Sequence, residues 1–205
     1  KLTVPSAAAG PSNLVARVVA LQLQELWKQP VVIDNRGAVN GVVGAELGQK
    51  APPDGYTLTV GNSGTHVMNY GLYKKLPYDP INGFAPIAKM AVAPGVLLAH
   101  AQLPYANVRD MLAYAKSHPT FVATPGATAQ FAASMLNAMA GAQLTIVPYK
   151  GNAPSDLAVA QGEAQLSITT LTSARPHVER GRARIPATMG RERASARPDI
   201  PTVQQ

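Results

Sequence analysis

The feature of this sequence that most constrains its fold is a repeated alternation of short apolar segments with longer amphipathic ones. The apolar segments recur from Leu2 to Ile168, and nearly all are followed by a turn and a stretch with helical periodicity. Strands that alternate with helices favour a mainly parallel sheet covered by helices, which is an α/β fold. Because 46% of the residues are hydrophobic and only 14% are charged, the chain can bury a core.

In the first half of the chain we expect strands over residues 2–4, 31–33 and 56–60. A helix is expected from Pro11, which suits a first helical turn, to about Trp27. A second helix follows Gly44. The periodicity of the first helix gives that helix an apolar face, made up of Leu14, Val15, Val18, Val19, Leu21 and Leu26.

In the second half we expect strands over 121–123, 144–147 and 166–169. The expected helices are 108–116 with Asn107 as its N-cap, 130–140, 153–161, and one capped by Ser173 that runs to Gly181. These elements suggest a first α/β lobe over 1–98, a second over 99–180, and a segment over 181–205 that returns toward the first lobe.

The charge of the chain is +7, and its basic residues gather near the end. Between Arg175 and Arg197 there are seven Arg against two Glu, without the interleaved aromatic residues typical of single-strand binders. We therefore expect a solvated basic face and no nucleic-acid partner. A positive field of this kind would also attract anionic ligands.

Several chemistries lack their residues here. The chain has no Cys, which excludes disulfides, thiol catalysis and Cys-based metal sites, and its four His show no metal-ligand spacing. Gly37, Gly41 and Gly44 do not form a dinucleotide-binding fingerprint. We expect no cofactor and no metal. No signal peptide is visible before the strand that starts the chain, so we expect a mature or trimmed protein.

Two loops of small residues each join the end of an expected strand to the start of a helix. They are Ser6–Gly10 and Thr124–Thr128. Open backbone N–H groups and the helix dipole make such a loop favourable for an anion, and ligands of open α/β sheets bind at the carboxyl ends of strands. Two lobes that present such loops to each other would clamp a carboxylate without a charged side chain.

The sequence resembles the Bug-type family, the periplasmic substrate-binding components of tripartite tricarboxylate transporters. The resemblance runs in order from Val4 to Val203, and the motifs that carry it are Val4–Asn13, Asp34–Ala38 with Gly41–Glu46, Ala51–Leu58, Leu72–Pro80 and Val147–Gly151.

The resemblance implies a type II periplasmic-binding fold, in which two α/β lobes joined by a hinge enclose a ligand. It implies a monomeric receptor in the periplasm, not an enzyme, that captures a small organic carboxylate and delivers it to the membrane components of such a transporter. Chains of this family continue beyond the point where the present sequence stops.

The resemblance also assigns ligand-binding roles. Those from the first lobe fall on Ser6, Ala7, Ala9, Gly10, Asn62, Ser63 and Thr65. Those from the second fall on Ala127, Thr128, Gln130, Tyr149, Lys150, Thr169 and Thr170. Their hydroxyl, amide and ammonium groups suit carboxylate oxygens, which accept several hydrogen bonds. This sequence departs from the family pattern at four places: Ala9-Gly10 replaces a Gly pair, Asn13 an Asp, Asn69-Tyr70 an Asn-Pro, and Thr169-Thr170 an Asp-Asn pair.

Two other functions have partial support in the sequence. Gly61–Thr65 followed by His66 is a near miss to the Gly-x-Ser-x-Gly nucleophile elbow of serine esterases, but its last position is Thr65 and no triad is specified. The second is a ligand-sensing or signalling domain, such as that of a transcription regulator, which can share the fold. A transcription regulator would need a helix-turn-helix partner, and none precedes Lys1. The loops assigned to the site contain no acidic residue, which predicts a ligand without an amine.

Overall fold

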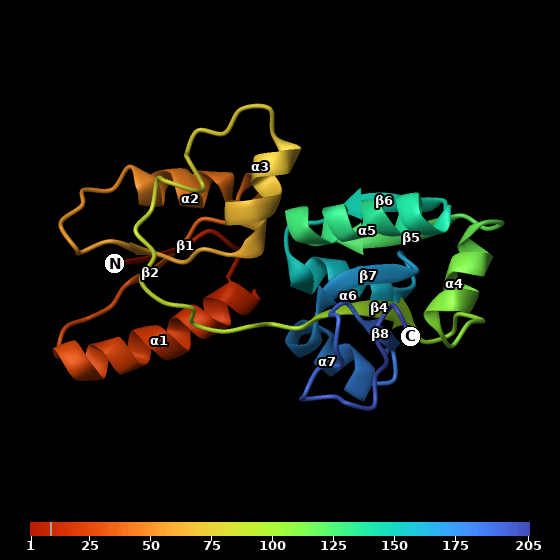
Figure 1. The fold of residues 1–205 in the computed structure, drawn as a ribbon. Coiled ribbons are helices and arrows are strands. Elements are labelled where there is room, and N and C mark those ends of the chain that lie inside the picture. The colour runs from red at the N-terminus through yellow and green to blue at the C-terminus, as the bar shows by residue number, and fades with distance from the viewer. Residues whose placement is uncertain (9) are drawn as a thin grey trace. The chain divides into compact units, whose positions relative to one another are not determined.

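A computed structural model describes residues 1–8 and 10–205, and divides the chain into two compact units, Lys1–Val92 and Ala93–Gln205 (Figure 1). Each unit has its own sheet and its own helices, so the α/β fold class is confirmed. The expected boundary after residue 98 falls inside strand β4 (Gly95–His100), which pairs with neighbours of the second unit on both sides.

The first unit is built on three parallel strands in the order β2-β1-β3. They are β1 (Leu2–Val4), β2 (Ile33–Asn35) and β3 (Leu58–Thr59), with Leu2 in register with Ile33 on one side and Leu58 on the other. Helices α1 (Pro11–Trp27) and α2 (Val42–Gln49) pack against them. The buried core of this unit consists of Leu2, Val4, Ala16, Ala20 and Val60.

Helix α1 has the predicted bounds, with Pro11 in its first turn, but most of its predicted apolar face is exposed. The residues it buries are Asn13, Ala16 and Ala20, whereas Leu14, Val18, Leu21 and Leu26 are 45–74% exposed. Small side chains on the inner face let the helix lie close to β1 and the core around Val4.

The rest of the first unit is irregular. A 3₁₀ turn (Val39–Gly41) precedes α2, and a π-helical turn (Gly64–Met68) runs directly into α3 (Asn69–Leu72). The Tyr78 hydroxyl donates to the Thr65 carbonyl at 2.7 Å and accepts from Asn69 Nδ2 at 3.1 Å. Burial raises the pKa of Tyr78, so it remains a neutral donor that holds this turn.

The second unit is built on a five-stranded sheet in the order β6-β5-β7-β4-β8. The strands other than β4 are β5 (Thr120–Thr124), β6 (Leu144–Pro148), β7 (Leu166–Thr170) and β8 (Ala183–Thr188). Strand β5 is parallel to β6 and β7, whereas β4 is antiparallel to both β7 and β8. The sheet is therefore mixed.

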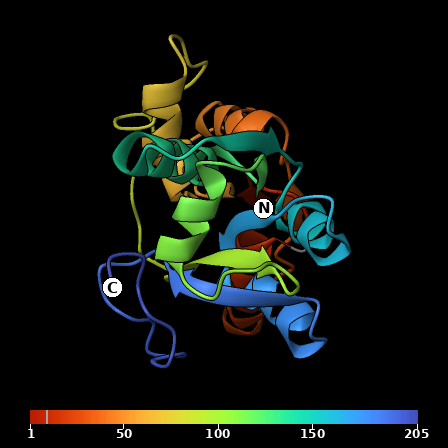
Figure 2. The same cartoon turned by 90° about the vertical axis from the view of Figure 1, so that its right-hand side faces the viewer.

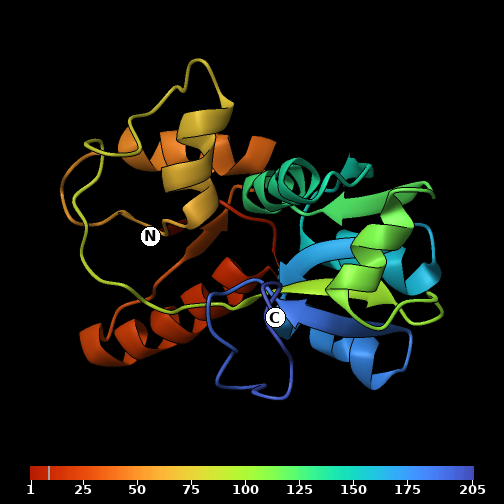
Figure 3. The same ribbon diagram turned by 45° about the vertical axis from the view of Figure 1, so that its right-hand side comes forward.

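Four helices cover the two faces of this sheet, an arrangement that can be followed in Figures 2 and 3. They are α4 (Val108–Ala115), α5 (Ala127–Ala140), α6 (Asn152–Gln161) and α7 (Leu171–Glu179). Alternate residues of β4 enter different cores: Leu97 packs with residues of α4 and α5, and Leu98 with residues of α6 and α7.

The segment expected to return toward the first lobe, 181–205, lies in the second unit. Its strand β8 occupies an edge of the sheet beside β4, and Thr188 bridges to Thr202 beyond it. Among the described residues, no helix combines the length and apolar character needed to span a bilayer. The same residues contain no group of three metal-ligating side chains.

Candidate functional site

Each unit brings its predicted site residues to one edge of its sheet. Strands β1, β2 and β3 run parallel, so the segments after Val4, Asn35 and Thr59 leave the sheet at the same edge. Strands β5, β6 and β7 also run parallel to one another, which places Thr124, Pro148 and Thr170 at one edge of the second sheet. These are carboxyl ends of strands, where ligands of open α/β sheets bind.

The first loop follows β1 directly. The Ser6 N–H donates to the Val4 carbonyl at 2.8 Å, and Gly10 is the N-cap of α1 without any side-chain cap. Ser6 and Gly10 are half-buried and Ala7 is exposed, while the predicted site residue Ala9 lies outside the described residues.

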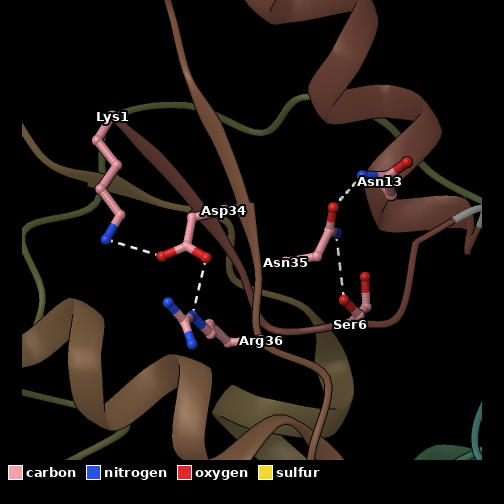
Figure 4. Close-up of polar contacts among 6 residues, drawn as sticks. All are labelled: Lys1, Ser6, Asn13, Asp34, Asn35 and Arg36. Carbon is pink, nitrogen blue, oxygen red and sulfur yellow. Dashed lines mark hydrogen bonds and ion pairs between the residues drawn. The ribbon is translucent and has the colours of Figure 1, made fainter.

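A directional chain of amides holds this loop in place (Figure 4). Arg17 Nε donates to Asn13 Oδ1 at 3.0 Å, Asn13 Nδ2 donates to Asn35 Oδ1 at 2.9 Å, and Asn35 Nδ2 donates to the Ser6 carbonyl at 3.2 Å. A guanidinium can only donate and a carbonyl can only accept, so the two ends fix the orientation of both amides. Asn13 is 1% exposed and supports the loop through its hydrogen bond to Asn35.

Three glycines let the segment after β2 approach the same loop. A Cβ added at Gly37 would lie 2.4 Å from the Ala7 nitrogen, and one at Gly41 would lie 2.6 Å from the Pro5 carbonyl oxygen. A Cβ at Gly44 would meet the Pro5 Cα at 2.7 Å. Gly41 also has a φ of +79°, which L side chains rarely adopt. These glycines therefore shape the floor of the loop after β1.

The residue before Asn35 has a different role. Asp34 is ion-paired with Lys1 Nζ and Arg36 Nε, both at 2.8 Å (Figure 4). The Lys1 hydrogen bond and the Arg36 guanidinium lower the pKa of the Asp34 carboxyl. Asp34 is thus already paired with two cations of the protein.

The loop after β3 carries a reciprocal cap. The Asn62 N–H donates to Thr65 Oγ1 at 3.2 Å, and the Thr65 N–H donates to Asn62 Oδ1 at 3.0 Å. Thr65 is 1% exposed, whereas Ser63 is exposed. Thr65 Oγ1 also lies 2.9 Å from His66 Nδ1, and burial lowers the pKa of that imidazole. These contacts define the π-helical turn that begins at Gly64.

In the second unit, the predicted site residues 127–130 and 149–150 follow the neighbouring strands β5 and β6. Helix α5 begins at Ala127, which is buried, and the structure leaves Thr128 exposed and Gln130 half-buried in its first turn. The Tyr149 N–H donates to the Thr124 carbonyl at 2.9 Å, which ties the turn after β6 to the end of β5. Tyr149 packs partly on the core, and Lys150 is exposed.

A buried carboxylate that the sequence did not mark lies beside the third predicted segment. Asp156 of α6 is 0% exposed and accepts hydrogen bonds from three hydroxyls: Ser167 Oγ at 3.2 Å, Thr169 Oγ1 at 2.9 Å and Ser173 Oγ at 2.5 Å. Burial is the main cause of the raised pKa of Asp156, and the hydroxyls oppose it. Asn152 Nδ2 donates to Thr169 Oγ1 at 2.7 Å.

The neighbouring Thr170 caps α7, because its Oγ1 accepts from the Ser173 N–H at 3.4 Å. The predicted cap, Ser173, is the third residue of the helix instead, and its hydroxyl is bound to Asp156. The periodicity of the sequence does not identify Asp156, Asn152 or Asn35 as site residues. Their roles depend on hydrogen-bond partners that lie on other elements.

Comparisons with known proteins give a consistent result. Residues 15–205 match the family model described as the tripartite tricarboxylate transporter family receptor. A UPF0065 protein from the tcbD-tcbE intergenic region of Pseudomonas sp. (strain P51) is 29% identical over 206 residues. That alignment covers 98% of this chain but 61% of the relative, so the chain spans about three fifths of its length.

Two solved structures have nearly the same fold. R. palustris Rpa4515 with adipate matches with a TM-score of 0.93 and 33% identity, over 98% of this chain and 69% of that one. MatC from Rhodopseudomonas palustris with bound malate matches with a TM-score of 0.91 and 30% identity, over 99% and 70%. Since the family model covers almost the whole sequence, this chain belongs to the tripartite tricarboxylate transporter receptor family.

Proposed function

We propose that this chain is the ligand-binding part of a periplasmic receptor for a small organic carboxylate, and that it is not an enzyme. The observation that carries the proposal is the close match to two solved structures, one with adipate and one with bound malate. The receptor would deliver its ligand to the membrane components of a tripartite tricarboxylate-type transporter. We expect it to act as a monomer without a nucleic-acid partner.

We propose ligand-binding groups in each unit. The first unit contributes the Ser6–Gly10 loop and the Asn62–Thr65 turn, and the second contributes the start of α5, the Tyr149–Lys150 turn and the end of β7. Backbone N–H groups at helix starts and side-chain donors such as Gln130 are the groups a carboxylate requires. Lys150 is exposed and adds a positive charge.

We propose that the ligand carries no amine. An ammonium group needs an acidic partner when it is buried, because a buried unpaired charge is very costly. Of the acids close to these loops, Asp34 is already paired with Lys1 and Arg36, and the Asp156 carboxylate is covered by three hydroxyls. Neither acid is available to a ligand.

Thermal unfolding of the full-length protein with adipate, malate or citrate tests the function. At least one should raise the melting temperature, and a ligand at 100 times its Kd stabilises by about 2.7 kcal/mol. The same acids as methyl esters serve as the control, because they lack the charged carboxylate. An unchanged melting temperature with every acid would contradict the proposed function.

A further inference from the structure

The buried carboxylate of Asp156 determines how the hydroxyls around it point. Each hydroxyl has one proton, and those of Ser167, Thr169 and Ser173 are donated to the carboxylate. The 2.5 Å contact with Ser173 has the length of a hydrogen bond from a hydroxyl to a charged oxygen. The Ser155–Ser167 contact at 2.8 Å is thereby resolved as well, with Ser155 as the donor.

The consequence reaches Asn152 through Thr169. With its proton given to Asp156, Thr169 Oγ1 can only accept, and it faces Asn152 Nδ2 at 2.7 Å. This orients the Asn152 amide with nitrogen rather than oxygen toward Thr169. An amide nitrogen carries two hydrogens, so one remains for another acceptor. Asn152 is half-buried and begins α6 directly after Gly151, next to the Tyr149–Lys150 turn.

We propose that Asn152 is a ligand-binding residue, whose remaining amide hydrogen contacts a ligand carboxylate oxygen, and that Asp156 is its positioning residue, acting through Thr169. This inference rests on the proposed carboxylate-receptor function and adds a donor to it. An acceptor-only Thr169 also means that the carbonyl of the Asn152 amide is turned away from this contact.

The chain Asp156–Thr169–Asn152 makes distinct predictions for conservative and non-conservative variants. In Asp156→Asn, the amide oxygen can still accept from Thr169 and Ser173, while its nitrogen donates to Ser167, whose proton turns to Ser155. Orientation of Asn152 is retained. Thr169→Ser also keeps the hydroxyl. Thr169→Val removes the acceptor that aims Asn152, and Asn152→Ala removes the donor itself.

Calorimetric titration of the full-length protein with adipate and with malate tests the inference. For whichever acid binds the wild type more tightly, Asn152→Ala and Thr169→Val should each raise Kd at least about tenfold. Thr169→Ser and Asp156→Asn should stay within about threefold. If the Kd of Asn152→Ala stays within threefold of the wild-type value, Asn152 does not bind the ligand. If the Kd of Thr169→Val stays within threefold of the wild-type value, Thr169 does not position Asn152. Failure of the wild type to bind either acid counts against the receptor function itself, and the inference falls with it.

A second measurement reads the positioning without any ligand. The side-chain NH₂ signals of Asn152, assigned by their loss in Asn152→Ala, should be well separated in the wild type and in Asp156→Asn. In Thr169→Val they should collapse toward the values of an exposed amide, with the backbone spectrum otherwise unchanged. Separated signals in Thr169→Val would contradict the positioning even if that variant folds less stably.

Discussion

At the scale of single residues, consecutive positions of one motif serve different purposes. In the segment Asp34–Gly37, Asp34 pairs with Lys1 and Arg36, Asn35 holds the Ser6 carbonyl, and Gly37 allows the Ser6–Ala7 peptide to pass at close range. None of these groups needs to contact a ligand. The motif therefore supports the loop after β1.

Replacing Gly37 with Ala should destabilise the protein by about 1–3 kcal/mol, the usual cost of overpacking. The added Cβ would lie 2.4 Å from the backbone nitrogen of Ala7, and backbone cannot turn aside as a flexible side chain can. Chemical denaturation measures the change. Gly71→Ala is a matched control, because nothing lies within 4 Å of a Cβ at that position. Equal stabilities for the two variants would refute this account of Gly37.

The raised pKa of Asp156 predicts a pH-dependent difference between the wild type and Asp156→Asn. Because burial lifts the folded-state pKa above its unfolded value of about 3.9, the folded protein binds this proton more tightly. Wild-type stability relative to the variant should therefore increase as pH falls from neutral toward 4. The charge of His177 opposes the shift. Melting temperatures of both proteins across this range measure the effect, and parallel curves would contradict it.

At the scale of elements, local patterns predicted most helices, but they did not predict the bounds of all the strands. Asn107 caps α4 as predicted, and Gly141 and Gly162 end α5 and α6 in the left-handed conformation that favours glycine. Strands β2 and β3 were displaced or shortened, because two- and three-residue strands are defined by pairing with β1 rather than by their own composition.

Other features depend on tertiary contacts that no local pattern contains. Strand β8 was not predicted, because Arg184 and Pro186 interrupt its apolar pattern. A strand at the edge of a sheet tolerates both residues. The antiparallel direction of β4 likewise follows from its partners β7 and β8. The loops of the candidate site were proposed from the sequence, but the Asn13–Asn35–Ser6 contacts and the contacts of Asp156 with Ser167 and Thr169 join residues 11 to 29 positions apart.

Helix α4 offers a test of the capping argument. Asn107 Oδ1 accepts from the Asp110 N–H and Asn107 Nδ2 donates to the Asp110 carboxylate, both at 2.9 Å. Asn107→Ala should lower the free energy of unfolding by about 1 kcal/mol, whereas Asn107→Ser should retain most of it. Urea denaturation measures both. A Ser variant as unstable as the Ala variant would show that the cap contributes little.

At the scale of the whole molecule, the two units contribute different kinds of groups. The first unit has a backbone loop held by Asn35, and the second has the side-chain donor Asn152 at the start of α6. The net charge of +7 adds a general attraction for anions. Under the proposed function, these groups would bind a carboxylate through hydrogen-bond donors.

The absence of an available acid near the assigned loops predicts discrimination against amines. Glutarate and glutamate have the same carbon chain and two carboxylates, and differ by one ammonium group. If the protein binds dicarboxylates of this length, glutarate should bind at least about tenfold more tightly, since the ammonium would lose its water without gaining a partner. Calorimetric titration of the full-length protein compares them. Tighter binding of glutamate would contradict the amine-free ligand.

The support beneath the loop after β1 has a kinetic consequence. The Ser6 carbonyl is held by Asn35, and Gly37, Gly41 and Gly44 lie close to the backbone of Pro5 and Ala7. Backbone that is held by such contacts imposes no folding step on association and loses little conformational entropy when a ligand binds. Encounter with an anion at this unit is then governed by diffusion and by the field of the basic chain, so ligand capture should slow as ionic strength rises.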